Sequence, residues 1–173
     1  MVKGLKERLL DGETVIVAEG YLIELERRGY LQAGAYIPEV VLDHPEVLKQ
    51  LHEEFVHAGS DVVEAFTYHC SEEWLKMVGR LHDYEPMNIR ALNIAKEVAL
   101  RTDTLMAGNT AEIGTYKKGD AKAIEKTREI YKPAALFGAI QTFYNFFELD
   151  SPSFFIGSTD SVTLLHVINS FFV

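Results

Sequence analysis

The segment of residues 12–69 constrains the fold most, because its apolar residues switch between the spacing of strands and that of helices. Val15–Ala18 is a short run rich in β-branched residues, which is typical of a strand buried on both faces. Apolar residues then recur at helical spacing over Tyr21–Arg28, and Gly29 supplies a helix stop. We therefore predict a strand followed by a helix, the repeating unit of parallel α/β sheets.

Two prolines predict the helices that come next. Pro38 and Pro45 each occupy a plausible first helical position, where the missing N–H is not needed, and an acidic residue follows each of them. The helix after Pro45 is amphipathic, and residues 61–68 form the second expected strand. Ser71 is a candidate N-cap for a short helix after that strand.

The strand and helix pattern then repeats. Residues 86–101 predict a helix, residues 104–109 a third strand, and residues 120–131 the helix after it. This order indicates parallel strands joined by helical crossovers, so the fold class is α/β. Three strands close no barrel, and we expect the inner side of the sheet, including Val63 and Ala65, to lack strands that would bury it.

Length and charge narrow the class of protein. With 173 residues and 47% hydrophobic content the chain supports a core, but a complete (β/α)8 barrel needs about 250 residues. The net charge of −9 argues against nucleic acids and anionic membranes as partners. The first residues lack the apolar stretch of a secretory signal, and Cys70 is the single cysteine, so we expect a cytoplasmic protein.

The composition changes at Pro133. Residues 133–173 contain no Lys or Arg and hold eight of the ten phenylalanines, without an amphipathic period. The runs at residues 143–147 and 161–173 are typical of aggregation-prone segments. We expect residues 133–173 to be a hydrophobic tail unrelated to the preceding fold, which ends a truncated product.

Two histidine-containing motifs invite a metal-site hypothesis. His52 and His57 are five residues apart, which separates them by roughly 140° around a helix, whereas a zincin motif needs a spacing of four. We therefore expect a solvated helix face with one partly buried histidine. The pair His69-Cys70 lacks a third and a fourth ligand nearby in the sequence. We predict no metal site in this chain.

Several short motifs carry a resemblance to a known family. An acidic residue and a glycine, Glu19-Gly20, end the first expected strand, and the next helix carries the motif LERRGY at residues 25–30. These motifs resemble the start of the homocysteine S-methyltransferase domain, nearest to the betaine-homocysteine methyltransferase type. The resemblance fades near Tyr131 and also includes residues 44–46, 51–55, 58–60, 65–68 and 105–109.

The resemblance implies a fold and a reaction. Residues 1–132 would be about three β-α units of a (β/α)8 TIM-type barrel. The reaction would transfer a methyl group from betaine or S-methylmethionine to the sulfur of L-homocysteine, giving methionine. In the family, a zinc ion held by three cysteine thiolates keeps that sulfur deprotonated. Because Cys70 is not at a family ligand position, we expect this chain alone to have no catalytic residues and no methyltransferase activity.

The resemblance also implies where the substrate binds. The loop with Glu19, Gly20 and Tyr21 would form part of the amino-acid pocket, with the Glu19 carboxylate accepting hydrogen bonds from the amino group of homocysteine. Glu19 is alternatively a capping acid of the next helix. Family members place hydroxyl and aromatic side chains at the end of the second strand, here Thr67 and Tyr68.

Three further interpretations of these strand ends stay open. Tyr68 would contact substrate or only pack, and Asn109, after the third strand, would face the pocket or serve a turn. His69 stands where close relatives carry an aromatic residue, so the contact that this aromatic residue makes with substrate would differ in this chain. The predicted substrate-binding residues are therefore Glu19, Gly20, Tyr21, Thr67, Tyr68 and Asn109.

Two other readings of the whole chain remain. A non-catalytic fragment would pair with itself or with a full-length relative through open sheet edges. Alternatively, the gene product continues into a normal barrel and is an active enzyme. By resemblance, the small-molecule partners are L-homocysteine and a methyl donor.

Overall fold

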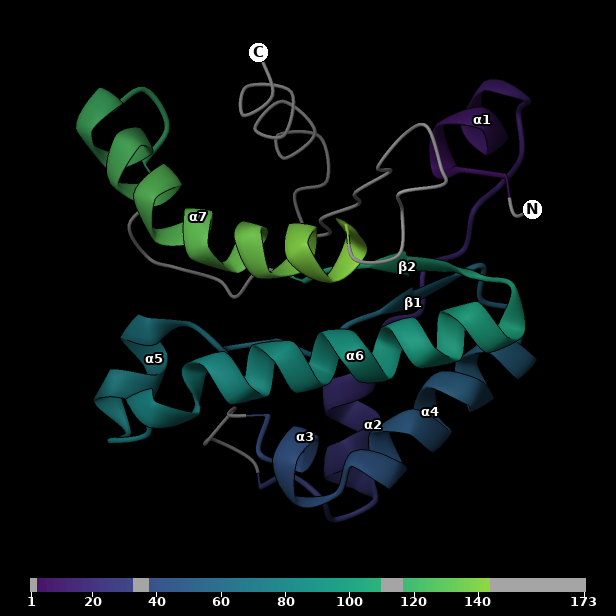
Figure 1. Ribbon diagram of the computed structural model, residues 1–173, viewed down its shortest axis with the longest axis horizontal. Helices are drawn as coiled ribbons and strands as arrows, with labels where there is room; N and C mark the ends of the chain where they lie inside the picture. The colour runs from purple at the N-terminus through teal and green to yellow at the C-terminus, as the bar shows by residue number, and fades with distance from the viewer. Residues whose placement is uncertain (1–2, 33–37, 110–116, 144–173) are drawn as a thin grey trace.

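A computed structural model describes residues 3–32, 38–109 and 117–143, in which helices pack against a small parallel sheet (Figure 1). Helix α6 runs across the middle of the view, with α2, α3 and α4 below it and α7 above it. In chain order the elements are α1 Leu5–Leu10, α2 Tyr21–Arg27, α3 Val40–Asp43, α4 Pro45–His57, β1 Val62–Glu64, α5 Glu72–Met77, the 3-10 helix η1 Leu81–Asp83, α6 Tyr84–Thr102, β2 Leu105–Ala107 and α7 Ala121–Phe143.

The sheet confirms the predicted parallel order but is shorter than the sequence suggested. Strands β1 and β2 pair in parallel, with Val62 opposite Leu105 and Glu64 opposite Ala107. The strand expected at Val15–Ala18 is reduced to a single parallel bridge between Val17 and Val62. β1 therefore lies between the first expected strand and β2, so the carboxyl ends of three successive segments meet at one edge of the sheet.

Most of the local start and stop signals act as the sequence predicts, except that Pro38 lies before Glu39, the N-cap of α3, and not at the first position of that helix. Pro45 occupies the first turn of α4, and the Ser71 hydroxyl accepts a hydrogen bond from the Trp74 backbone N–H at 3.3 Å at the start of α5. After α2, Gly29 adopts a φ of 82°, which side-chain-bearing residues rarely adopt. The Tyr30 N–H then donates to the Leu25 carbonyl at 2.9 Å, so the helix ends where the glycine was expected to end it.

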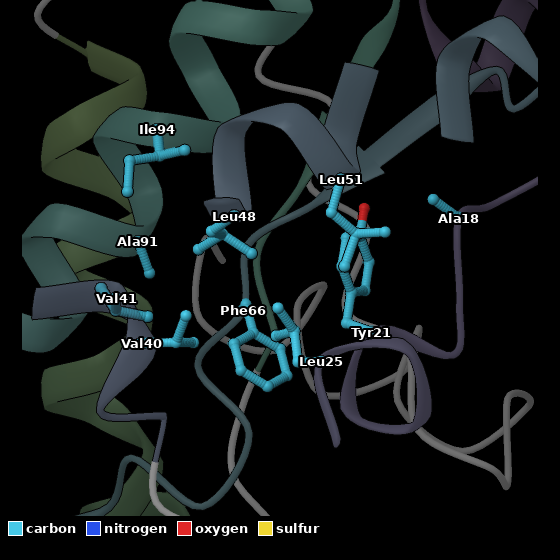
Figure 2. Packing of buried hydrophobic residues seen from close by; sticks show 10 residues of the cluster. All are labelled: Ala18, Tyr21, Leu25, Val40, Val41, Leu48, Leu51, Phe66, Ala91 and Ile94. Atoms are coloured by element: carbon cyan, nitrogen blue, oxygen red, sulfur yellow. The ribbon is translucent and has the colours of Figure 1, made fainter. Parts of the chain in front are cut away.

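The main core lies between α2, α3, α4 and α6 (Figure 2). Leu25, Leu48 and Leu51 are fully buried there, because the helical spacing of apolar residues places them on the faces that α2 and α4 turn towards each other. Residues of the four helices are joined by Ala18 and Phe66 from the loops beside the sheet. The buried cluster is Ala18, Tyr21, Leu25, Val40, Val41, Leu48, Leu51, Phe66, Ala91 and Ile94.

A second apolar cluster joins β1 to α6 and corrects one prediction. Val63 and Ala65 are fully buried against α6, where they meet Leu92, Ala95 and Val98. The expectation that they face an uncovered inner side of the sheet is therefore wrong. Because side chains alternate along a strand, burying Val63 against α6 directs Glu64 to the opposite face.

Helix α7 also departs from the prediction, which ended that helix near Tyr131. It runs from Ala121 to Phe143 and therefore continues through Pro133. The change in composition at Pro133 does not end the helix, because Ala and Leu after it favour helix formation. The expected domain boundary at 132/133 falls inside α7, and the predicted aggregation-prone run at 161–173 and most of that at 143–147 lie outside the described residues.

None of the helices in the described part of the chain is both long enough and apolar enough to cross a membrane.

Candidate functional site

A polar cluster occupies the carboxyl ends of β1 and β2. Glu64 is the last residue of β1 and is only 7% exposed. The side-chain amide of Asn109, two residues beyond β2, donates a hydrogen bond to Glu64 Oε1. The Thr67 hydroxyl donates to the backbone carbonyl of Asn109, so the segment after β2 is fastened to the segment after β1 at two points.

The surroundings of Glu64 favour its neutral form. Burial raises the pKa of this carboxyl to about 7, and the negative charge of Glu19 adds to the rise, while the hydrogen bond from Asn109 opposes it. A carboxyl group with this pKa exchanges a proton near neutral pH. Glu64 is therefore poised to change charge with pH or with the arrival of a charged ligand.

Glu19 and Gly20 lie where the first bridged segment enters α2. Both are exposed, and Gly20 is the N-cap residue of α2 with a φ of 84°. A Cβ at Gly20 would have nothing within 4 Å, so the glycine is needed for its backbone conformation and not for space. The helix has no side-chain cap hydrogen bond, which leaves the capping alternative for Glu19 without a contact to support it.

Tyr21 links this loop to the core. It is 6% exposed, its hydroxyl lies 2.9 Å from His52 Nδ1, and the Glu64 backbone N–H donates to the same hydroxyl at 3.4 Å. The Tyr21 ring packs edge-on against His52 and Phe55. This packing gives Tyr21 a structural role beneath Glu64, and a direct contact between Tyr21 and substrate stays a prediction.

His52 is more deeply buried than the sequence suggested. One histidine is buried and the other, His57, is exposed, as expected, but His52 is 0% exposed and therefore fully and not partly buried. Burial lowers the pKa of His52 to about 3, which keeps the imidazole neutral. The His52 side chain packs in the core beside Tyr21, whereas His57 faces solvent, so the two rings do not point to a common position.

Tyr68 belongs to an aromatic stack beside the strand ends. The His69 ring stacks between Tyr68, at a centroid distance of 4.2 Å, and Trp74, at 4.5 Å. His69 has a φ of 57°, a conformation that is unusual for a residue with a side chain. Tyr68 also packs against the main core, so the structure gives it a packing role, while a substrate contact stays a prediction.

The described residues do not fit the zinc ion that the resemblance implies. Cys70 is 3% exposed, and its Sγ accepts a hydrogen bond from Asn88 Nδ2 at 3.2 Å. Burial raises the pKa of this thiol to about 12, which disfavours the thiolate that a zinc ligand requires. Within residues 3–32, 38–109 and 117–143, no three His, Cys, Asp or Glu side chains are grouped as metal ligands.

Taken together, the parallel strands with helical crossovers and the polar strand ends define an α/β protein with its candidate ligand site at the carboxyl edge of the sheet. The sequence profile of the family described as homocysteine S-methyltransferase matches residues 15–147. The chain belongs to the homocysteine S-methyltransferase family. The match passes Lys132 and includes all of α7.

Individual relatives agree with this assignment. S-methylmethionine–homocysteine S-methyltransferase of Pongo abelii is 42% identical over 115 residues, which cover 66% of this chain and 30% of that protein. Betaine–homocysteine S-methyltransferase 1 of Danio rerio is 37% identical over 132 residues, which cover 75% of this chain and 32% of that protein. The chain thus spans about a third of the length of these curated relatives.

A solved structure shows the same fold. The metallated homocysteine methyltransferase MmuM from Escherichia coli superposes with a TM-score of 0.63 at 17% sequence identity. The match covers 77% of this chain and 52% of that chain. At this identity the similarity establishes the fold of the aligned part only.

The sequence interpretation missed Glu64. Asn109 contacts Glu64 and Thr67, the Tyr21 hydroxyl accepts the Glu64 backbone N–H, and Glu19 lies close enough to influence Glu64. The structure therefore gathers four of the six predicted residues around Glu64, which was not among them. A signal was present, because an ionisable residue inside the apolar run Val62–Phe66 is unusual for a buried strand. The predicted alternation places Val63 and Ala65 on the inner face, which directs Glu64 to the wrong side.

Proposed function

We propose that this chain forms a homocysteine-binding part of a homocysteine S-methyltransferase, with betaine or S-methylmethionine as the methyl donor in the complete reaction, which gives methionine. The observation that carries this proposal is the position of Glu19, Glu64 and Asn109 at the carboxyl ends of three successive parallel segments, all inside the range that the family profile matches. Ligands of parallel α/β barrels bind at this edge.

The proposed role of the polypeptide 1–173 by itself is binding without catalysis. Methyl transfer to sulfur requires a thiolate, and a free thiol, with a pKa of about 8.5, is mostly protonated at pH 7. The chain supplies one thiol, Cys70, which is buried in contact with Asn88. We therefore expect this polypeptide to hold no stoichiometric zinc and to leave the uncatalysed rate unchanged.

Calorimetric titration of the 173-residue chain with L-homocysteine under reducing conditions tests the binding role. We expect saturable binding at one site per chain, and weaker binding by Asn109→Ala, which removes the amide that orients Glu64. Glu97→Gln is the matched control, because Glu97 is an exposed acid on α6 that pairs with Lys49 and has no contact with the strand ends. No binding by the intact chain would contradict the proposal.

Zinc content and methyl transfer are measured on the same preparation. Elemental analysis after dialysis should find no stoichiometric zinc, and methyl-labelled betaine or S-methylmethionine should give no labelled methionine above the uncatalysed rate. One tightly bound zinc per chain would contradict the expectation that it holds no metal, and labelled methionine whose formation is lost in Glu64→Gln would show that the chain is catalytic on its own.

A second candidate function is a non-catalytic fragment that pairs with a full-length relative. In the described residues, β2 has a strand neighbour only on the β1 side, and β1 lies between β2 and the Val17 bridge. A strand edge of this kind accepts another strand by backbone hydrogen bonds. Light scattering of this chain mixed with a full-length homocysteine S-methyltransferase would detect a one-to-one complex, and separate peaks would exclude this candidate.

A further inference from the structure

Glu64 differs from the other buried carboxyl group in the described part of the chain. Asp83 is 9% exposed and its carboxylate receives Arg80 Nε at 2.6 Å, so its charge is neutralised within the fold. Glu64 is 7% exposed, and no Lys, Arg or His of the described residues forms an ion pair with it. Buried carboxylates are normally paired with a cation, so Glu64 is exceptional among the described residues in being buried without one.

The position of Glu64 shows from which side that counter-charge would come. Its strand neighbours Val63 and Ala65 point to α6, and Glu64 points to the other face, at the carboxyl edge of the sheet. Asn109 donates to one carboxyl oxygen, Oε1, while its own backbone is held by Thr67. The carboxyl group is therefore oriented by the protein, and among the described residues only its Oε1 accepts a side-chain hydrogen bond.

The charge state of Glu64 depends on the side chains that the elements packed against β1 place near it. Helix α6 presents the apolar side chains Leu92, Ala95 and Val98. Helix α4 contributes the neutral His52, which reaches Glu64 only through the Tyr21 hydroxyl. The segment before α2 contributes the negative charge of Glu19, and the segment after β2 contributes the uncharged Asn109.

We propose that Glu64 is the carboxylate that receives the α-ammonium group of the amino-acid ligand, and that it releases its proton to solvent when that ligand binds. The inference rests on the proposed function, since it takes an α-amino acid as the ligand of this site. The step is balanced: the Glu64 O–H bond breaks, the proton leaves to the buffer, and a charge-assisted hydrogen bond forms between the carboxylate and the ammonium group. The ligand keeps all its protons.

The proton balance follows from the state of the free site. Burial and the charge of Glu19 raise the pKa of Glu64 to about 7, so the free carboxyl group is largely protonated at pH 6. An ammonium group beside it favours the ionised form and lowers that pKa. Ligand affinity should therefore rise by about tenfold per pH unit below pH 7, and level off above it.

The sequence analysis assigns the amino group of the ligand to Glu19, whereas this proposal assigns it to Glu64. Substitutions of the two residues should therefore have different effects on binding. Glu19 is exposed, and a carboxylate in solvent gains little from an ion pair. Glu64 is buried and oriented, so its contact with the ammonium group carries more of the affinity. Glu19→Gln should thus weaken binding much less than Glu64→Gln, although both changes remove one negative charge.

The test compares L-homocysteine with 4-sulfanylbutanoate, which has the same thiol and carboxylate but no amino group. Calorimetric titrations of the intact 173-residue chain at pH 5.5, 6.5 and 7.5 give the affinities, and two buffers of different ionisation enthalpy give the protons released. For L-homocysteine we expect the pH dependence above, with release of nearly one proton per ligand at pH 5.5. The analogue should bind without this pH dependence and without proton release.

Glu64→Gln is the decisive variant, because glutamine keeps an oxygen that accepts the Asn109 hydrogen bond. It should weaken L-homocysteine binding at pH 7.5 by about 10- to 100-fold, abolish its proton release and leave the analogue unchanged. Glu97→Gln should bind as the wild type does. A thermal melt of each variant confirms that it is folded.

The outcomes separate the two proposals. If the chain binds L-homocysteine and Glu64→Gln leaves both affinity and proton release unchanged, the role of Glu64 is refuted and the proposed function stands. Equal binding and equal pH dependence for the analogue would also refute it. If neither ligand binds to the intact chain, the proposed function fails and the role of Glu64 fails with it.

Discussion

The core between α2, α3, α4 and α6 and the carboxyl edge of the sheet are built from opposite kinds of side chain. In the core, Leu25, Leu48 and Leu51 are buried among apolar neighbours and are replaceable only by residues of similar size. At the sheet edge, Glu64 is also buried but lies beside the polar Asn109 and Tyr21 hydroxyl, and burial opposes its charge. The first region stabilises the fold, whereas the second holds a carboxyl group whose ionised form is disfavoured by burial.

The two regions are joined by one hydrogen-bonded chain. The Tyr21 hydroxyl contacts His52 in the core and the Glu64 backbone at the sheet edge. Two buried ionisable groups are thus connected through a residue that belongs to both regions. Burial lowers the pKa of His52 and raises that of Glu64, so the two groups affect the pH dependence of stability in opposite directions, which can be measured.

The largest expected effect is on the core. Leu51→Ala should lower the free energy of unfolding by about 2 to 5 kcal/mol, because it removes a fully buried side chain and leaves a cavity. Leu100→Ala is the matched control on α6, where the side chain is 67% exposed, and it should change stability by less than about 0.5 kcal/mol. Urea denaturation followed by circular dichroism measures both, and similar losses would mean that the core is packed differently.

Glu64→Gln should raise the free energy of unfolding at alkaline pH, whereas Leu51→Ala lowers it. The ordinary pKa of this carboxyl is 4.5 and the folded value is about 7, so between these values the folded chain holds a proton that the unfolded chain has released. The free energy of unfolding of the wild type therefore falls as pH rises through this window. The glutamine variant escapes that loss and should be more stable by about 2 to 3 kcal/mol at pH 8.

Measuring the free energy of unfolding at several pH values distinguishes the loss of the buried charge from a general packing effect of Glu64→Gln. At pH 4 the wild type and Glu64→Gln should differ little, because Glu64 is protonated in both folded and unfolded chains. A variant that is equally stabilised at pH 4 and pH 8, or destabilised at pH 8, would contradict the buried state of this carboxyl group.

His52 should produce a stability loss on acidification. Its ordinary pKa is 6.5 and its folded value is about 3, so between these values the unfolded chain binds a proton that the folded chain excludes. Its contribution to the free energy of unfolding is lost as pH falls, by about 1.4 kcal/mol per pH unit. His52→Leu should lack this component when urea midpoints are compared at pH 6, 5 and 4. The exposed His57→Leu should keep the wild-type slope, and a common slope in all three chains would disprove the assignment.

The smallest expected effect concerns a local cap. Ser71→Ala should lower stability by about 1 kcal/mol, because the first turn of α5 loses the hydrogen bond from the Trp74 N–H. Ser71→Thr should restore most of it, since threonine also caps helices. If alanine and threonine behave alike in thermal melts, the loss comes from packing and not from the cap.

Local signals in the sequence were sufficient for most of the helical framework. The Ser71 cap, the Gly29 stop and Pro45 in the first turn of α4 depend on residues a few positions apart, and all three are confirmed. The strands were placed correctly but made too long, because an apolar run does not show where pairing stops. Helix α7 extends past its predicted end near Tyr131, because a change in composition does not by itself stop a helix.

The candidate site was harder to predict because its contacts span long distances in the sequence. Asn109 and Glu64 are 45 residues apart, and Tyr21 and His52 are 31 apart. The resemblance indicated Glu19, Thr67 and Asn109, but the strand alternation around Val63 was assigned to the wrong face, so Glu64 was not recognised. Only the packing of α6 on β1 decides that alternation, and this packing is not encoded in a local motif.

The pKa of Glu64 in the free chain is the most direct test of the contrast between the two regions. Carbon-detected NMR of the glutamate carboxyl groups, with Glu64 assigned by comparison with Glu64→Gln, gives this value without any ligand. A midpoint near 7 is expected, as burial and the charge of Glu19 dictate. A midpoint near the ordinary 4.5, together with an unchanged midpoint in Asn109→Ala, would mean that Glu64 is solvated and would contradict the account of the sheet edge.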